Sequence, residues 1–305
     1  MSYLAPKDFV RSPEALARSW STAEAQDYTR WLATRHYENF HVVSFLLPKR
    51  LHQDFYNVYA FCRWADDLGD EIGVPAESLS LLGWWREQLH AMYSGAARHP
   101  VFVALRPTVE RHRIPREPFA DLIRAFIQDQ TVTRYETYED LFGYCRNSAN
   151  PVGRLVLYLC GYSDAERHKL SDATCTALQL ANFWQDVSVD LLKGRIYIPL
   201  EVIHRHGYSV AALSAGSETA EFQAVMKEVV DRARSLFERG LPLAGMVNRR
   251  LSLDLYLFSR GGMCILDKIE QQHYAVLSKR PVISKGERLI LLLGSLFRAA
   301  FSRAA

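Results

Sequence analysis

Closely spaced cysteines are missing from this sequence. Its five cysteines lie far apart, and no two of them have the CxxC spacing of a zinc site or a redox pair. The same wide spacing argues against a disulfide framework. We therefore expect reduced thiols within the core at Cys62, Cys145, Cys160, Cys175 and Cys264.

Long apolar runs and long basic runs are also missing. No uncharged apolar run approaches the roughly 20 residues that span a bilayer, and the first residues lack the apolar stretch of a signal peptide. The formal net charge is only +3, and the lysines and arginines do not gather in blocks that would follow a phosphate backbone. We therefore expect a cytoplasmic protein that does not bind nucleic acid.

Helical periodicity runs through most of the chain. Apolar residues recur at helical spacing, as in Leu82, Trp85 and Leu89, and no sustained alternation with a period of two is found. Breaks are expected at glycines and prolines, including Pro107. Because no low-complexity linker divides the chain, we predict one all-α domain over residues 1–305. It would have a helical extension over residues 1–35 and a long helix that begins within residues 217–221 and runs toward Leu241.

Residues 284–305 predict an amphipathic C-terminal helix. This segment combines apolar residues with basic ones, namely Leu289, Ile290, Leu291, Leu292, Leu293, Leu296, Phe297 and Phe301 with Arg288, Arg298 and Arg303. Such a helix either packs its apolar side on the core or lies on a membrane surface. In the second case the protein would be peripheral on the inner face of the membrane.

Two segments carry aspartates that are one helical turn apart. In the first, Asp66 and Asp70 project from one face of a helix, with Arg63 one turn earlier on the same side. In the second, one face of an otherwise apolar helix carries the polar residues Gln179, Asn182, Asp186 and Asp190. A cationic and phenolic tail suited to phosphate oxygens follows, with Lys193, Arg195 and Tyr197.

The two aspartate pairs predict a magnesium-dependent diphosphate clamp. Mg²⁺ prefers oxygen ligands and commonly bridges one or two carboxylates to substrate phosphates. One such pair alone is most often a solvated edge of a helix. Two pairs within aromatic-rich, apolar helices are less easily explained in that way, because unpaired buried carboxylates are costly.

Three stretches resemble the squalene and phytoene synthase family, the head-to-head prenyl synthases. YAFCRWADDLGDE is similar to the first aspartate-rich motif of that family, QLANFWQDVSVDLLKGRIYIP to the second, and YCRNSANPVGRLVL to the segment between them. Weaker similarity extends from about His36 to Arg280. The resemblance implies a single-domain isoprenoid synthase helical bundle around a central cavity, with a prenyl diphosphate as its substrate.

The resemblance also assigns roles to individual residues. It implies that Mg²⁺ is held by Asp66, Asp70, Asn182, Asp186 and Asp190. It places beside the diphosphate Tyr59, Arg63, Lys193, Arg195 and Tyr197. It places along the prenyl channel Phe40, Tyr144, Ala149, Gly153, Gln179, Phe183 and Tyr274. Rings that would stabilise a carbocation are Phe40, Tyr59, Phe183, Trp184 and Tyr274, although ordinary core packing explains each ring at least as well.

The second motif departs from the pattern of the condensing members. They read close to NxxRDxxED, whereas this chain has Gln185 in place of the arginine and Val189 in place of the glutamate. With SANPVG in place of an AGxVG-like segment, the chain is similar to the bacterial hydroxysqualene synthase branch of hopanoid biosynthesis. That branch takes presqualene diphosphate from a sister synthase, its functional partner, and adds water after ionisation. Gln185 would act in catalysis by positioning that water, or it would fill the space of the arginine.

Three other interpretations fit parts of the sequence. A condensing presqualene diphosphate, squalene or phytoene synthase would act on farnesyl or geranylgeranyl diphosphate. A di-iron oxidase would use ExxH pairs, which occur at Glu87 and His90, Glu201 and His204, and Glu270 and His273. A catalytically silent partner would keep the fold only to bind a prenyl chain, and the two intact aspartate pairs argue against it.

Overall fold

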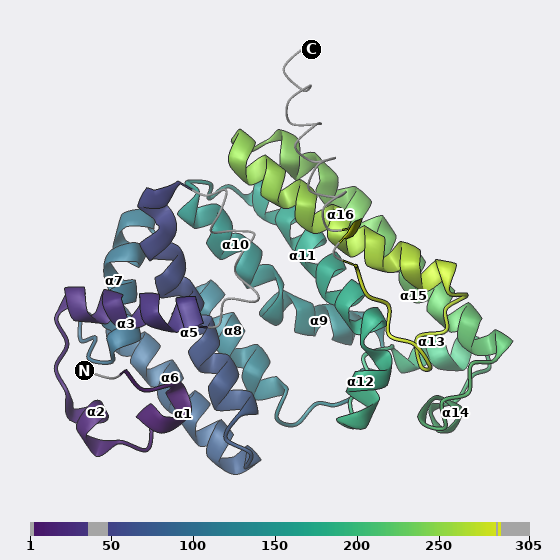
Figure 1. Ribbon diagram of the computed structural model, residues 1–305, viewed down its shortest axis with the longest axis horizontal. Helices are drawn as coiled ribbons and strands as arrows, with labels where there is room; N and C mark the ends of the chain where they lie inside the picture. Colours follow the sequence, from purple (N-terminus) through teal and green to yellow (C-terminus); the bar gives the residue numbers. More distant parts are fainter. Residues whose placement is uncertain (1–2, 36–47, 285, 288–305) are drawn as a thin grey trace. The chain divides into compact units, whose positions relative to one another are not determined.

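The computed structural model describes residues 3–35, 48–284, 286 and 287, which form helices joined by turns and loops (Figure 1). Within these residues there is no β-strand, and an isolated bridge joins Arg134 to Ile196. The all-α prediction is confirmed. The chain divides into two compact units, a first unit of Met1–Thr131 with Arg154–Ser163 and a second unit of Val132–Gly153 with Asp164–Ala305. The single domain over residues 1–305 stays a prediction.

Two predicted features fall wholly or largely outside the described residues. Phe40 is one of them, and of the C-terminal helix predicted over residues 284–305 only residues 284, 286 and 287 are described. In the described part of the chain, no helix combines the length and the apolar character needed to cross a membrane.

The first unit is a bundle of helices around α5. Its elements are α1 (Pro6–Phe9), α2 (Pro13–Ala17), α3 (Thr22–Arg35), the 3-10 turn η2 (Lys49–Leu51), α5 (His52–Asp70), α6 (Pro75–Tyr93), α7 (Pro100–His112) and α8 (Glu117–Gln128). Proline begins both α6 and α7, where its missing N–H would have no helical partner in any case. Helix α5 packs against α3, α6, α7 and α8 and therefore lies at the centre of the unit.

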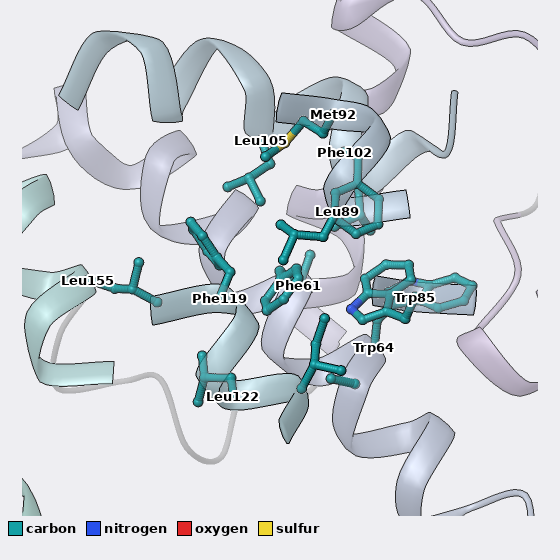
Figure 2. Packing of buried hydrophobic residues seen from close by; sticks show 14 of the residues in the cluster. Phe61, Trp64, Trp85, Leu89, Met92, Phe102, Leu105, Phe119, Leu122 and Leu155 are labelled. Carbon is teal, nitrogen blue, oxygen red and sulfur yellow. The ribbon is translucent and has the colours of Figure 1, made fainter. Parts of the chain in front are cut away.

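An aromatic core fixes the orientation of α5. Phe61 and Trp64 lie on its inner face and are wholly buried. Trp64 stacks on Trp85 of α6, with ring centroids 5.0 Å apart and planes 7° from parallel, and Phe61 meets Phe119 of α8 edge to face at 4.9 Å (Figure 2). Burial of one such side chain stabilises the fold by about 1.5 to 3 kcal/mol. Rotation of α5 would therefore be costly, and Asp66 and Asp70 are held on the less buried side of the helix.

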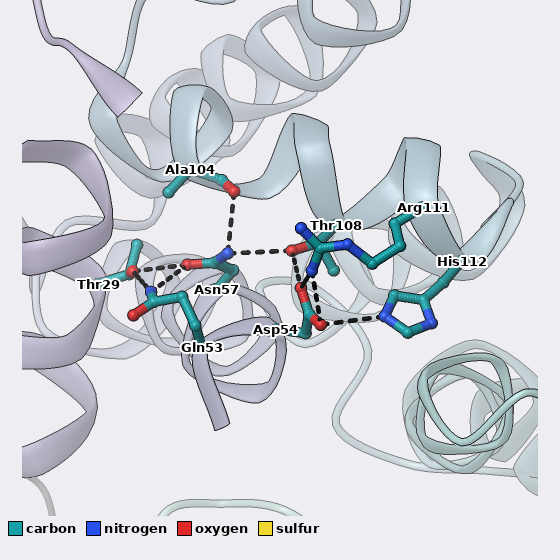
Figure 3. A network of polar contacts seen from close by, with 8 residues as sticks. All are labelled: Thr29, Gln53, Asp54, Asn57, Ala104, Thr108, Arg111 and His112. Carbon is teal, nitrogen blue, oxygen red and sulfur yellow. Dashed lines mark hydrogen bonds and ion pairs between the residues drawn. The ribbon is translucent and has the colours of Figure 1, made fainter. Parts of the chain in front are cut away.

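A buried polar network ties α5 to α3 and α7 (Figure 3). The Asp54 carboxylate, which is 1% exposed, accepts hydrogen bonds from Thr108 at 2.7 Å and from Arg111 at 2.9 and 3.0 Å. His112 Nε2 lies 3.0 Å from the same carboxylate. Asn57 donates to Thr108 Oγ1 at 3.0 Å and accepts from a threonine of α3 at 2.7 Å. The buried charge is tolerated because several donors surround it.

The second unit is built around α11. Its elements are α9 (Tyr138–Ser148), α10 (Asn150–Leu159), α11 (Ala165–Gln185), α12 (Val187–Leu192), α13 (Leu200–Arg205), α14 (Val210–Ser214), α15 (Ala220–Gly240), the 3-10 segment η3 (Leu241–Gly245) and α16 (Arg249–Gln271). Helix α10 begins in this unit, and its later residues belong to the first. Helix α15 begins after Thr219, whose side chain accepts a hydrogen bond from Phe222 N. The long helix predicted there is confirmed.

Two glycines let α11, α15 and α16 approach closely. A Cβ atom on Gly240 of α15 would lie 2.1 Å from Thr174 Oγ1 of α11. A Cβ atom on Gly262 of α16 would lie 2.2 Å from Phe237 Cζ of α15. A larger residue at either position would force these helices apart. Helix α11 is thus held by two neighbours along its length.

Candidate active site

The first aspartate motif, residues 59–71, lies at the end of α5. Asp66 is half-buried, and Asp70 is exposed at the last residue of the helix. Arg63 places Nη1 3.3 Å from Asp66 Oδ2 and Nη2 2.5 Å from Asp67 Oδ1. Its Nη2 also lies 3.2 Å from Glu71 Oε1. The guanidinium therefore serves three carboxylates, two of which, Asp67 and Glu71, the sequence pattern did not single out.

Negative charge exceeds positive charge at this motif. Burial raises the pKa of Asp67 to about 7, although the nearby Arg63 guanidinium lowers it. Burial also raises the pKa of Asp66, and the carboxylates of Asp70 and Glu71 raise it further, against the effect of Arg63. A bound divalent cation would favour the charged forms of these groups. The carboxylate oxygens of Asp66 and Asp70, together with the excess negative charge around them, are suitable ligands for Mg²⁺.

Two further side chains near Arg63 on α5, those of Tyr59 and Cys62, stay neutral at physiological pH. Burial raises the pKa of the Tyr59 phenol, so this half-buried side chain keeps its proton and can donate a hydrogen bond. Burial, together with the charge of Asp66, raises the pKa of the Cys62 thiol to about 12. Cys62 is therefore not a nucleophile here.

The second aspartate motif, residues 179–197, lies where α11 ends and α12 begins. Asp186 separates the two helices with a ψ of 15°, far from the helical value of about −42°. The single helix that we predicted for this motif is therefore interrupted. Hydrogen bonds nevertheless continue across the junction, because Asp186 N donates to Asn182 O at 3.0 Å and Asp190 N donates to Asp186 O at 2.9 Å. The two aspartates remain about one turn apart.

Asp190 borders a small hollow. Burial and the charge of Asp186 raise its pKa to about 6, against the opposing charges of Lys193 and Arg195. The hollow is shallow and partly open to solvent, and it is lined by Phe183, Val187, Asp190, Leu191, Arg195, Ile196, Tyr197, Ile198 and Leu213. Its wall is apolar except for Asp190, Arg195 and the Tyr197 hydroxyl. The raised pKa and the oxygen donors make Asp186 and Asp190 a second pair that fits Mg²⁺.

Stacked aromatic rings form one side of this hollow. Phe183 and Tyr197 lie face to face, with ring centroids 3.7 Å apart and planes 6° from parallel. Tyr144 lies 6.2 Å from each of them, and Tyr135 lies 5.9 Å from Tyr197. The structure thus brings Tyr197, which was predicted beside the diphosphate, together with Tyr144 and Phe183, which were predicted along the prenyl channel. Tyr135 was missed, because its segment carries no motif.

A segment after α16 reaches the second motif. The Arg280 guanidinium forms an ion pair and a hydrogen bond with Asp186. Beside it, Gln185 Nε2 donates to the Pro281 carbonyl at 2.7 Å. Gln185 was predicted either to position water or to fill space, and its amide nitrogen is committed to the backbone. Arg280 lies at the edge of the stretch with family resemblance and was not predicted as a site residue.

Other predicted positions have varied surroundings. Asn182 and Lys193 are exposed, Gln179 is half-buried, and Trp184 is wholly buried. Ala149 follows the end of α9. A Cβ atom on Gly153 would lie 2.4 Å from both Ser171 Oγ and Cys175 Sγ, so glycine allows α10 to pack against α11. Tyr274 follows α16 with a φ of 62° and has charged neighbours on α15 and α16. The channel role of these residues stays a prediction.

The histidines of the three ExxH pairs, His90, His204 and His273, are all exposed. Across the described ranges, no three histidine, cysteine or acidic side chains converge as ligands of one ion. The geometry therefore gives no support to a di-iron centre. The paired aspartates offer a different arrangement, in which two carboxylates at each motif would share a cation with phosphate oxygens.

Known proteins resemble this chain over most of its length. The family model described as squalene/phytoene synthase matches residues 33–287. The crystal structure of squalene synthase HpnC from Alicyclobacillus acidocaldarius is 43% identical, with a TM-score of 0.80, and the match covers 83% of this chain and 95% of that one. A dehydrosqualene synthase crystallised with a ligand is 25% identical, with a TM-score of 0.81 and coverage of 93% and 98%. The 15-cis-phytoene synthase of Synechococcus elongatus is 30% identical over 95% of this chain and 97% of its own length.

Proposed function

This chain belongs to the squalene/phytoene synthase family, and we propose that it converts presqualene diphosphate into hydroxysqualene and diphosphate. The family comprises prenyltransferase-type enzymes that act on prenyl diphosphates head to head, and the chain has their all-α isoprenoid synthase fold. The proposed reaction is the second half of that chemistry. It consists of ionisation, rearrangement of the carbocation and capture of water.

The composition of the second motif carries this proposal. Gln185 and Val189 stand where condensing members of the family carry an arginine and a glutamate. In the structure, Gln185 binds a backbone carbonyl and Val189 is 37% exposed, so neither residue adds charge beside Asp186 and Asp190. A motif altered at both positions fits an enzyme that receives an already condensed substrate. The 43% identity to a squalene synthase, against 30% to a phytoene synthase, supports a C30 substrate.

Ionisation is assigned to the two aspartate motifs and their basic neighbours. Mg²⁺ held by Asp66, Asp70, Asp186 and Asp190, with Asn182, would stabilise the negative charge that develops on the leaving diphosphate. Arg63 in the first motif, and Lys193 and Arg195 in the second, would hold phosphate oxygens through charge-assisted hydrogen bonds. The neutral Tyr59 phenol would donate to a further oxygen.

We assign the aromatic rings beside Asp190 to contact with the carbocation that ionisation leaves. Phe183 and Tyr197 cover one face of each other, and the outer face of either ring would stabilise a cation by about 0.5 to 2 kcal/mol. Gln185 retains Oε1 as an acceptor for one water, because only its nitrogen is bonded to Pro281. We keep water positioning by Gln185 as a hypothesis.

The alternative is a condensing synthase that acts on farnesyl or geranylgeranyl diphosphate. The phytoene synthase relative favours it, because the match covers nearly the whole of both chains. In that case two prenyl diphosphates would bind, and the first step would form a carbon–carbon bond. Under the favoured reading, a separate presqualene diphosphate synthase supplies the substrate.

Product analysis separates the two reactions. Purified protein with Mg²⁺ is given presqualene, farnesyl or geranylgeranyl diphosphate in separate tubes, in ordinary and in ¹⁸O-labelled water, and products are identified by mass spectrometry. We expect ¹⁸O-labelled hydroxysqualene from presqualene diphosphate alone. Condensation of farnesyl or geranylgeranyl diphosphate would establish the alternative. The same tubes with Gln185→Leu test water positioning, since a variant that still forms only the alcohol would exclude that role.

A further inference from the structure

The chain after α16 folds back as a strap, residues 272–281, that ends on the second motif. His273 and Tyr274 adopt positive φ values of 54° and 62°, which reverse the chain at the helix end. Tyr274 N donates to Ile269 O at 2.8 Å and closes the reversal. Figure 1 shows the segment in yellow as it leaves α16 and turns back.

Side chains hold this strap at successive points. Gln272 Nε2 donates to the carbonyls of Ala275 and Lys279, both at 2.9 Å. Glu218, between α14 and α15, accepts from the backbone N–H groups of Leu277 and Ser278 at 2.8 and 3.0 Å. The backbone is therefore held up to Lys279, and this sets the position of Arg280, which follows it.

The last points of attachment lie on the second motif itself. Gln185 binds the Pro281 carbonyl, and the adjacent Asp186 binds the Arg280 guanidinium. The Asp186 side chain is 17% exposed, whereas that of Arg280 is 44% exposed. A nearby cation favours the charged form of a carboxylate that is this enclosed and lies one turn from Asp190. Arg280 supplies that charge through Asp186 Oδ1.

We propose that Arg280 is a resident counter-ion that competes with the divalent cation for Asp186, and that Gln185 is the positioning residue that sets the strength of this competition. The inference rests on the proposed function, because it takes Asp186 as a metal ligand. The metal gains full access to Asp186 only when the guanidinium moves from Oδ1. Gln185 opposes that movement by holding the strap at Pro281.

Metal binding without substrate tests the competition. Mn²⁺ shares the preference for oxygen ligands and is paramagnetic, so its free concentration can be followed by electron paramagnetic resonance during titration of the full chain. We expect Arg280→Gln to tighten Mn²⁺ binding about three- to tenfold, because a charge-assisted contact no longer has to be broken. Gln185→Leu should also tighten Mn²⁺ binding, by a smaller factor than Arg280→Gln. Unchanged or weaker binding by Arg280→Gln would overturn the proposal.

Matched variants identify the cause. Arg280→Lys keeps the charge and should stay near the wild-type affinity. Lys279→Gln removes a neighbouring exposed positive charge from the strap and should leave the affinity unchanged. If Lys279→Gln tightens binding as much as Arg280→Gln, general charge explains the effect and the competition is excluded.

Asp186→Asn separates failure of the inference from failure of the metal assignment. We expect this variant to weaken Mn²⁺ binding. If it does and Arg280→Gln does not tighten binding, only the competition is wrong. If Asp186→Asn leaves binding unchanged, Asp186 is not a metal ligand, and both the assignment and the competition are wrong.

Discussion

The two aspartate motifs share a residue type and a spacing, yet they balance their charge differently. In the first motif, Arg63 pairs with carboxylates on its own helix, up to one residue beyond its end. In the second, the partner of Asp186 is Arg280, 94 residues later in the chain. Compensation in the first motif is therefore built into α5. In the second, Lys193 and Arg195 oppose the charge of Asp190, whereas compensation of Asp186 depends on a folded strap and is lost if that strap moves.

The largest expected effect is a loss of activity that is the same for an aspartate substitution in either motif. Asp66→Asn and Asp186→Asn should each lower kcat/KM about a hundredfold or more, because each removes charge from a carboxylate that the reaction needs beside the diphosphate. Turnover of presqualene diphosphate is the measurement. Asp231→Asn, which changes an exposed aspartate paired with Lys227 on α15, is the control and should stay within about twofold. A tolerant aspartate in either motif would show that the motifs are not equivalent.

Loss of the local cation should affect stability next most strongly. Arg63→Ala leaves Asp67, whose side chain is 5% exposed, without its ion pair. We expect a loss of about 2 kcal/mol in the free energy of unfolding, measured by urea denaturation at pH 8. Arg106→Ala breaks an exposed pair with Glu110 and should cost less than about 0.5 kcal/mol. Equal losses in the two variants would refute the structural role of Arg63.

The two motifs should also differ in the pH range over which a carboxyl group changes the free energy of unfolding. Asp67 has an ordinary pKa of 3.8 and a folded pKa of about 7. Between these values the folded state keeps a proton that the unfolded state releases, so a stabilising contribution present below pH 3.8 is lost as pH rises through about 7. Asp67→Asn should reduce this fall by roughly 1 kcal/mol or more between pH 5 and pH 8 in metal-free buffer.

Asp190 should show a narrower pH window. Its folded pKa is about 6, so its contribution is lost over a shorter range, and Asp190→Asn should change the slope of stability only up to about pH 6. Urea unfolding at closely spaced pH values measures both variants. If neither substitution alters the pH dependence of the free energy of unfolding, then the folded-state pKa values of Asp67 and Asp190 are not raised above the ordinary value.

The smallest expected effect is the stability change on losing the distant cation. Arg280→Gln should alter the free energy of unfolding by less than about 0.5 kcal/mol, because the Arg280 side chain is 44% exposed and its ion pair is screened by solvent. The measurement is urea denaturation beside Arg63→Ala. A loss as large as that of Arg63→Ala would remove the distinction between the two motifs.

The sequence predicted the features that depend on neighbouring residues. Apolar periodicity was enough to identify an all-α chain, and residues 217–221 were enough to predict the start of α15, which Thr219 caps. The position of Arg63 beside Asp66 followed from helical spacing. Pro107 was expected to break a helix, but α7 continues through it from Pro100 to His112. Burial of the surrounding helix, including Ala104, Leu105 and Thr108, offsets the cost of the proline.

Features that depend on distant segments could not be predicted. Nothing in the spacing of residues 179–197 indicates that Asp186 would interrupt the helix or that Arg280 would pair with it. Tyr135 joins Tyr197 only because residues 133–136 run beside residues 196–201, as shown by the bond from Ile196 N to Thr133 O. Such contacts arise from tertiary packing, which a single sequence does not encode as a repeating pattern.

The buried network around Asp54 has a mechanical consequence for the first motif. Asp54 and Asn57 attach the beginning of α5 to its neighbours, and the stack of Trp64 on Trp85 attaches its middle. Sliding or rolling of α5 would break both sets of contacts together. The last turn is attached as well, because Ser78 Oγ and Gln130 Nε2 both donate to the Gly69 carbonyl. Helix α5 is therefore held along its whole length, and Asp66 and Asp70 can adapt to a ligand by side-chain rotation and not by movement of the helix.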